Sequence, residues 1–175
     1  MTKHLHVRQL TAADLVAYRA LHRFGIEESP SGFIDVGETD AARPDAEIVA
    51  MLTRGEGWGA FEGERLLGKL SIDALPYPSL APTFWLRAVY VHPDARGTGA
   101  SGRLIRAAIE HARAKGASRM ALWVHAANPH AMALYERIGL RESGRVPLGI
   151  SINGELVDDV LMSMPLGNVT KEFAQ

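Results

Sequence analysis

One continuous segment, residues 89–104, constrains the fold more than any other part of the chain. It reads Val89-Tyr90-Val91-His92-Pro93-Asp94-Ala95-Arg96-Gly97-Thr98-Gly99-Ala100-Ser101-Gly102-Arg103-Leu104. The pattern predicts an apolar strand, a short proline turn and a glycine-rich loop that opens directly into a helix. Glycines remove the side chains that would block a close approach, and a helix N-terminus carries partial positive charge. The segment therefore predicts a site where backbone amides bind a phosphorylated cofactor.

The remaining chain reads as strands and helices on either side of this segment. Strands are expected over 4–10, 58–61, 65–75, 83–91, 119–124, 141–152 and 155–166, and helices over 11–24, 45–54, 99–115 and 128–138. The order β-α-α-β-β-β-α-β-α-β-β predicts an α/β fold with a mixed central sheet flanked by helices. A chain of 175 residues is expected to form a single domain, 1–175.

Local signals set several boundaries. Thr11 with Asp14 forms a capping box at the start of the first helix, and Gly25 is expected to end that helix. The polar, acidic segment 25–43 is then a long loop for a compact domain, which makes it a candidate binding loop. Asn153-Gly154 indicates a tight turn between the last two strands.

The glycine loop admits two other nucleotide-binding interpretations. Residues 97–102 match G-x-G-x-x-G, the dinucleotide-binding fingerprint, but residues 92–96 separate this match from its strand. The next strand, 119–125, offers no acidic residue for a ribose. A Walker-type loop lacks its Gly-Lys-Ser/Thr. Both interpretations are therefore disfavoured.

Composition excludes several function classes. The chain has no cysteine, so a thiolate nucleophile and a cysteine-based metal site are ruled out. The zinc-binding motif His-Glu-x-x-His is also absent from the sequence. The formal net charge of −1 gives no general attraction to nucleic acid or to an anionic membrane. No apolar run approaches the ~20 residues that span a bilayer. A cytoplasmic location is expected.

The glycine loop, followed by Leu104-Ile105 on the inner face of its helix, resembles the acetyl-CoA loop of the GNAT superfamily of N-acetyltransferases. A second pattern of that superfamily follows at the expected separation, as Leu122-x-Val124-x-x-x-Asn128-x-x-Ala131-x-x-Leu134-Tyr135-x-x-x-Gly139-Leu140. The detailed resemblance covers 83–140. One departure is Ser101, which stands where the family places glycine or alanine.

The resemblance implies a GNAT-like single domain that uses acetyl-CoA as co-substrate. It assigns the backbone of Val89, Tyr90 and Val91 to the pantetheine arm. It assigns Arg96 and the amides of Gly97, Thr98, Gly99, Ala100, Ser101 and Gly102 to the pyrophosphate. Asn128 matches a residue that binds near the pantetheine, although the same position suits a plain helix N-cap. Tyr135 matches a tyrosine that protonates the departing thiolate, although its helical spacing also suits core packing.

The acceptor half of the site has no specific signature. The strands 83–91 and 119–125 carry no carboxylate, so no residue stands out as the general base. The candidates are Glu28, which lies beside Glu27 in the acidic 25–43 loop, His125, the pair Asp158 and Asp159, and a water relay. The expected acceptor is a primary amine of a small molecule or a peptide N-terminus, which attacks the thioester directly. Dimers are common in the family, so a homodimer is expected. The alternative function is a non-catalytic acyl-CoA-binding regulatory module on the same fold.

Overall fold

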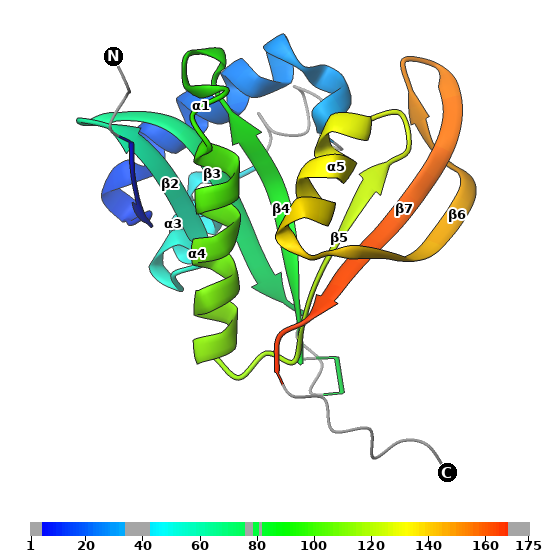
Figure 1. Ribbon diagram of the computed structural model, residues 1–175. Coiled ribbons are helices and arrows are strands. Elements are labelled where there is room, and N and C mark those ends of the chain that lie inside the picture. The colour runs from blue at the N-terminus through cyan, green and yellow to red at the C-terminus, as the bar shows by residue number, and fades with distance from the viewer. Residues whose placement is uncertain (1–4, 34–42, 76–78, 81, 168–175) are drawn as a thin grey trace. The chain divides into compact units, whose positions relative to one another are not determined.

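The computed structural model describes residues 5–33, 43–75, 79–80 and 82–167. Seven strands form one mixed sheet in the order β1-β2-β3-β4-β5-β7-β6 (Figure 1). The strands are β1 (His6–Gln9), β2 (Gly57–Glu62), β3 (Arg65–Ala74), β4 (Thr83–Val91), β5 (Arg119–His125), β6 (Arg141–Ile152) and β7 (Glu155–Pro165). The α-helices are α1 (Leu15–Glu28), α3 (Asp45–Thr53), α4 (Ala100–Ala114) and α5 (Pro129–Ile138). The predicted fold class and element order are confirmed, with short 3₁₀ turns added at 12–14, 30–32 and 93–95.

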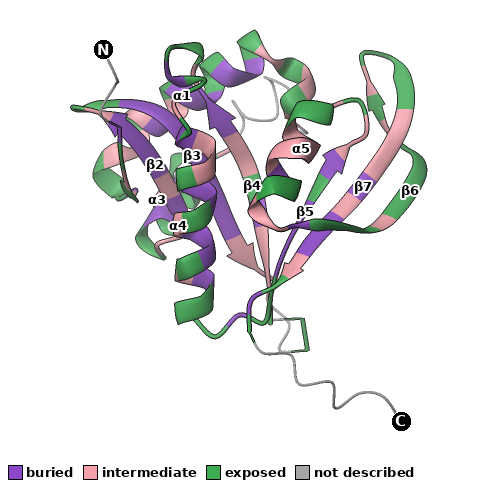
Figure 2. Ribbon diagram, in the orientation of Figure 1, coloured by how far each residue is buried: buried purple, intermediate pink, exposed green. Residues whose placement is uncertain are grey.

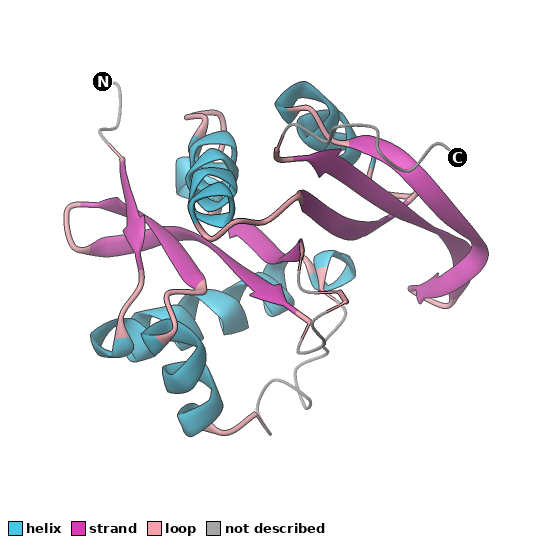
Figure 3. Ribbon diagram, turned by 90° about the horizontal axis from the view of Figure 1, so that it is seen from below, coloured by secondary structure: helices cyan, strands magenta, loops and turns pink. Residues whose placement is uncertain are grey.

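The chain divides into two units, of which the first comprises the residues up to Ile72 together with Arg87–Ala108. Strands β1, β2 and β3 pair antiparallel here, and helices lie on both faces of the strands (Figure 3). Helix α4 approaches one face closely, since a Cβ added to Gly68 would lie 3.1 Å from the Leu104 side chain. Helices α1 and α3 pack in a second cluster whose buried members include Leu10, Leu52 and Phe61.

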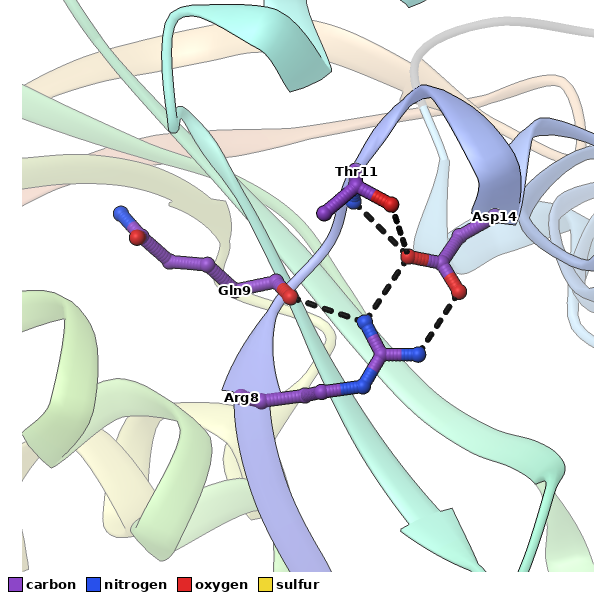
Figure 4. A network of polar contacts seen from close by, with 4 residues as sticks. All are labelled: Arg8, Gln9, Thr11 and Asp14. Atoms are coloured by element: carbon purple, nitrogen blue, oxygen red, sulfur yellow. Dashed lines mark hydrogen bonds and ion pairs between the residues drawn. The ribbon is translucent and has the colours of Figure 1, made fainter.

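A polar network fixes the junction between β1 and the first helical turn (Figure 4). The guanidinium of Arg8 donates two hydrogen bonds of 2.8 Å to the carboxylate of Asp14, and the amide of Thr11 donates to the same carboxylate at 2.8 Å. The predicted capping box is thus present. The Arg8 guanidinium also lies 4.1 Å from the centre of the Phe61 ring, so one side chain ties the cap to β2.

The prediction that the first helix ends at Gly25 is wrong. Helix α1 continues to Glu28, and Gly25 is buried within it. A Cβ at this position would lie 2.8 Å from the Phe33 ring and 3.1 Å from the Tyr90 ring. Gly25 is therefore a site of close approach between α1 and these rings, where glycine serves packing and does not interrupt the helix. Of the predicted 25–43 loop, residues 25–28 are helical, and 34–42 lie outside the described residues.

The second unit comprises Asp73–Leu86 and the residues from Ile109 onward. The start of β4 pairs parallel with β5 over Thr83–Trp85, and β5, β7 and β6 then pair antiparallel. Asn153 and Gly154, with φ of 53° and 83°, form the predicted turn between β6 and β7. Most buried residues of these strands are apolar and include Met120, Leu122, Val160 and Met162; buried Ser163 of β7 is polar.

Burial differs sharply between strands (Figure 2). Strand β3 is buried over seven consecutive residues, as expected for a strand inside a sheet, whereas β6 is exposed along most of its length. Among the described residues, no helix is both long and apolar enough to cross a membrane.

Candidate active site

The glycine loop lies between the 3₁₀ turn Pro93–Ala95 and the first turn of α4. Gly97 and Gly99 have φ of 75° and 78°, a region that L side chains rarely adopt, and a Cβ added to either would meet nothing within 4 Å. The glycines are therefore needed for backbone conformation, and the space above them is open. Among the described residues, the amides of Gly97, Thr98 and Gly99 donate no backbone hydrogen bond.

The loop is held from within by side chains. The hydroxyl of Thr98 donates to the carbonyl of Ala95 at 2.6 Å. The guanidinium of Arg103 donates to the carbonyl of Thr98 at 3.3 Å and to that of Leu5 at 2.9 Å. These bonds fix the carbonyls of the loop and leave its amides available.

This arrangement fits a pyrophosphate. Ala100, Ser101 and Gly102 form the first turn of α4, and the first-turn amides of a helix lack an intrahelical acceptor. Together with residues 97–99 they supply a continuous run of N–H groups at the positive end of a helix. The residue set therefore matches the phosphate-bearing cofactor that the sequence predicts.

Strand β4 brings Val89, Tyr90 and Val91 to the start of this loop. Ala88, just before them, has a φ of 49°, which interrupts the extended conformation of the strand. Tyr90 and Val91 are buried, and the Tyr90 ring lies 5.6 Å from that of Phe33. The strand that the family resemblance assigns to the pantetheine arm is thus fixed by packing on one side.

A polar cluster joins the end of α1 to this region. Arg96 forms a bidentate ion pair with Glu28, with Nη1–Oε1 at 3.0 Å and Nη2–Oε2 at 2.6 Å, and its Nε donates to the Val91 carbonyl at 3.3 Å. The Tyr90 hydroxyl donates to Oε2 of Glu28 at 3.0 Å. Arg96 is the main cause that lowers the pKa of Glu28, and burial followed by the Glu28 contact raises the pKa of Tyr90 to about 12.

The sequence does not predict this cluster, because Gly25 indicates a helix end that would place Glu28 in a loop. A helix that continues past Gly25 sets Gly25 and Glu28 on one face, since they are three residues apart. Even so, no local pattern pairs Glu28 with Arg96, which lies 68 residues further along the chain.

In the second unit, α5 carries two of the predicted residues. The side chain of Asn128 accepts a 3.1 Å hydrogen bond from the amide of Ala131, so it caps this helix. Tyr135 is buried, with 8% of its surface exposed, and burial raises the pKa of its phenol to about 12. Tyr135 is therefore a protonated donor over the whole neutral range.

The remaining base candidates lie on neighbouring strands of this unit. His125 ends β5 and stands opposite Asp159 of β7, whose pKa is raised by burial and lowered less by His125. Asp158 is already engaged, since it accepts from Arg145 at 2.9 Å and from the amide of Leu148 at 3.0 Å. His125 and Asp159 thus form a cross-strand pair, whereas Asp158 stabilises the β6–β7 hairpin.

The first unit therefore brings together Glu28, Tyr90, Arg96 and the loop 97–102. The second unit holds His125, Asn128 and Tyr135. Within the described ranges, no three histidine, aspartate or glutamate side chains gather as metal ligands.

Comparison with known proteins defines the class. A profile of the Acetyltransferase (GNAT) family matches residues 16–140, which is more than half of the chain. The chain belongs to this family, as its two sequence motifs predict.

Individual relatives agree with this assignment. The L-methionine sulfoximine/L-methionine sulfone acetyltransferase of Pseudomonas aeruginosa is 34% identical over 79 residues, which are 45% of this chain and 46% of that protein. The chain thus spans about half the length of this curated relative.

Two solved structures share the fold. The GNAT-family acetyltransferase of Streptococcus pneumoniae superposes with a TM-score of 0.80 at 22% identity, covering 94% of this chain and all of that one. Salmonella typhimurium yncA, solved with its cofactor acetyl-CoA, gives a TM-score of 0.82 at 18% identity over 98% and 99% of the two chains.

Proposed function

We propose that the protein is an acetyl-CoA-dependent N-acetyltransferase that acts on a primary amine of a small molecule or on a peptide N-terminus. The observation that carries the proposal is the run of available amides over residues 97–102, held by two positive-φ glycines at the start of α4. Family membership supports it, and the similarity to an acetyltransferase of methionine sulfoximine supports a small-molecule acceptor.

The bound cofactor supplies a thioester, whose C–S bond breaks as the amine nitrogen forms a C–N bond with the acetyl carbon. The chain's own residues then have four tasks: holding the cofactor, orienting the acceptor, removing a proton from the amine and returning one to the thiolate. Residues 96–102 hold the phosphates, and the backbone of residues 89–91 together with Asn128 orients the arm. Tyr135 donates the proton to sulfur. The chain has no cysteine to carry the acetyl group, which supports direct transfer to the amine.

The acceptor amine loses its proton to His125, to Glu28 or to a water relay. The position of His125 directly opposite Asp159 in the β5–β7 pair supports His125, because a neighbouring carboxylate can hold the imidazole in place. The engagement of Glu28 by Arg96 counts against a free carboxylate at that position. A single domain over 1–175, a cytoplasmic location and a homodimer stay predictions.

The alternative is a non-catalytic acyl-CoA-binding module. The specific observation in its favour is that β4 and β5 carry no carboxylate to act as base. Such a module would bind acetyl-CoA without turnover.

The first experiment measures release of free thiol from acetyl-CoA across a panel of amines, with heat-inactivated protein as the control. The protein contributes no thiol of its own. Amine-dependent release supports the enzyme and identifies the class of acceptor. Binding of acetyl-CoA without amine-dependent release favours the module, and absence of both contradicts the proposal.

Replacement of Tyr135 by phenylalanine separates the two functions. We expect turnover to fall about 100-fold with unchanged affinity for acetyl-CoA, because a general acid acts only in the transition state. Steady-state kinetics and calorimetry measure the two quantities. Tyr18→Phe, which removes another buried phenol, is the matched control. Full activity in Tyr135→Phe would rule out the phenol as the acid.

A further inference from the structure

Glu28 stands at a position that is unfavourable for a carboxylate by itself. It is the last residue of α1, where the partial negative charge of the helix C-terminus repels an acidic side chain. Helix stability therefore gives no reason for glutamate here, and its partners lie outside the helix. Those partners are Arg96 and Tyr90, which are 68 and 62 residues further along the chain.

We infer that Glu28 is a positioning residue that fixes the Arg96 guanidinium at the entrance of the glycine loop, so that it acts through Arg96 and not on the acceptor amine. The inference deepens the proposed function and rests on it. The role of this ion pair lies outside the two family motifs, which do not include Glu28.

The geometry leaves Glu28 few free acceptor positions. Both carboxylate oxygens accept from Arg96, and Oε2 also accepts from the Tyr90 hydroxyl. A general base must offer a lone pair to the proton that it removes, and three of the roughly four lone-pair sites of this carboxylate already accept hydrogen bonds. The neighbouring Glu27 is exposed, as Glu28 is, but forms none of these contacts.

The ion pair restrains the side chain of Arg96. Its guanidinium has five N–H groups, of which one goes to Val91 and two go to Glu28, so two have no acceptor among the described residues and could bind an anion. Its side chain is 49% exposed and would be mobile without the carboxylate. Because Arg96 directly precedes Gly97, its anchoring also restrains the start of the loop.

Charge and positioning predict opposite results. As a simple negative charge near a phosphate site, Glu28 would weaken the binding of coenzyme A, and its neutralisation would strengthen it. As a positioning residue, it preorganises Arg96 and the loop, so neutralisation would weaken binding. The sign of the change therefore distinguishes the two roles.

The test compares Glu28→Gln with Glu27→Gln, which removes the same charge one residue away on the same helix. The affinity of the full-length protein for coenzyme A is measured by titration calorimetry. We expect about tenfold weaker binding for Glu28→Gln, because glutamine offers one oxygen acceptor where the bidentate contact with Arg96 uses two. We expect no weakening for Glu27→Gln. Equal or tighter binding by Glu28→Gln would overturn the inference.

A second variant keeps the question answerable if Glu28→Gln folds poorly. Arg96→Lys keeps the positive charge but cannot form the bidentate contact with Glu28, and we expect it to weaken coenzyme A binding to a similar degree. Wild-type affinity in Arg96→Lys would show that charge alone matters. In an Arg96→Gln background, Glu28→Gln is expected to have no further effect on the affinity.

Kinetics separate a positioning role from a base. We expect Glu28→Gln to raise the KM for acetyl-CoA and to keep the acidic limb of the pH–kcat profile. Loss of that limb with an unchanged KM would instead make Glu28 the base and overturn the inference alone. Wild-type protein that fails to bind coenzyme A would overturn the proposed function together with it.

Discussion

At the scale of single residues, the partner of a carboxylate decides what it does. Asp14, Glu28 and Asp158 each face an arginine, and the pKa of each is lowered mainly by it. Asp159 forms no ion pair with an arginine in the described part of the chain, and burial raises its pKa. Acidic residues that look alike in the sequence therefore differ in the structure. Three are ion-paired with a lowered pKa, whereas Asp159 is protonated more easily than a free aspartate.

Asp14 gives a prediction for stability against pH. Its pKa is about 2 in the folded chain, lowered chiefly by Arg8, against 3.8 for an unperturbed aspartate. The ionised carboxylate therefore stabilises the fold above pH 3.8, and this contribution is lost as the pH falls through about 2. We expect Asp14→Ala to lower the free energy of unfolding at pH 7 by about 1 kcal/mol, since the cap is lost and Arg8 is partly exposed.

Urea unfolding across pH measures this effect. The difference between wild type and Asp14→Ala should shrink as the pH approaches 2, whereas Glu27→Gln should match the wild type throughout. A difference that stays constant with pH would mean that the charge of Asp14 contributes nothing.

The residues of the candidate site differ in how far the sequence predicts them. The N-cap at Asn128 is a local property, because cap and helix are adjacent in the chain. The contact between Glu28 and Arg96 joins residues 68 apart, and no local pattern encodes it. Contacts of the second kind depend on packing, which the sequence alone does not give.

At the scale of elements, strand and helix periodicity gives most of the fold. Strand β4 begins and ends where its pattern predicts, because its largely apolar run lies between Pro82 and Pro93. Helix α1 departs from its pattern, because Gly25 predicts a helix end whereas the helix continues to Glu28. The physical reason is tertiary: two aromatic rings need the space where a side chain would be.

Gly25→Ala tests this explanation. Alanine favours a helix over glycine by about 1 kcal/mol, whereas overpacking a core costs about 1–3 kcal/mol. We expect a net loss of about 1 kcal/mol in the free energy of unfolding, because the added Cβ would lie 2.8 Å from the Phe33 ring. Gly32→Ala, where a Cβ meets nothing within 4 Å, is the control. A more stable Gly25→Ala protein would show that the rings yield easily.

At the scale of the whole molecule, the prediction concerns ligand binding. Coenzyme A at 100 times its Kd should stabilise the native state by about 2.7 kcal/mol. For a chain of this length that corresponds to a rise in Tm of about 5–10 °C. NADH, measured by the same thermal scan, should leave the Tm unchanged, because the strand after the glycine loop has no acidic residue for a ribose. A rise with NADH alone would reverse the cofactor assignment.

Strand β6 ends the strand order, so one side of it has no neighbour within the described sheet. Its register shifts between Glu142 and Gly144 and again between Val146 and Ile150, and Pro147 within the second shift has no amide hydrogen. A long, regular rim would be a template on which strands of other molecules could add. These irregularities interrupt that template and protect the β6 edge of the sheet against fibril-like growth.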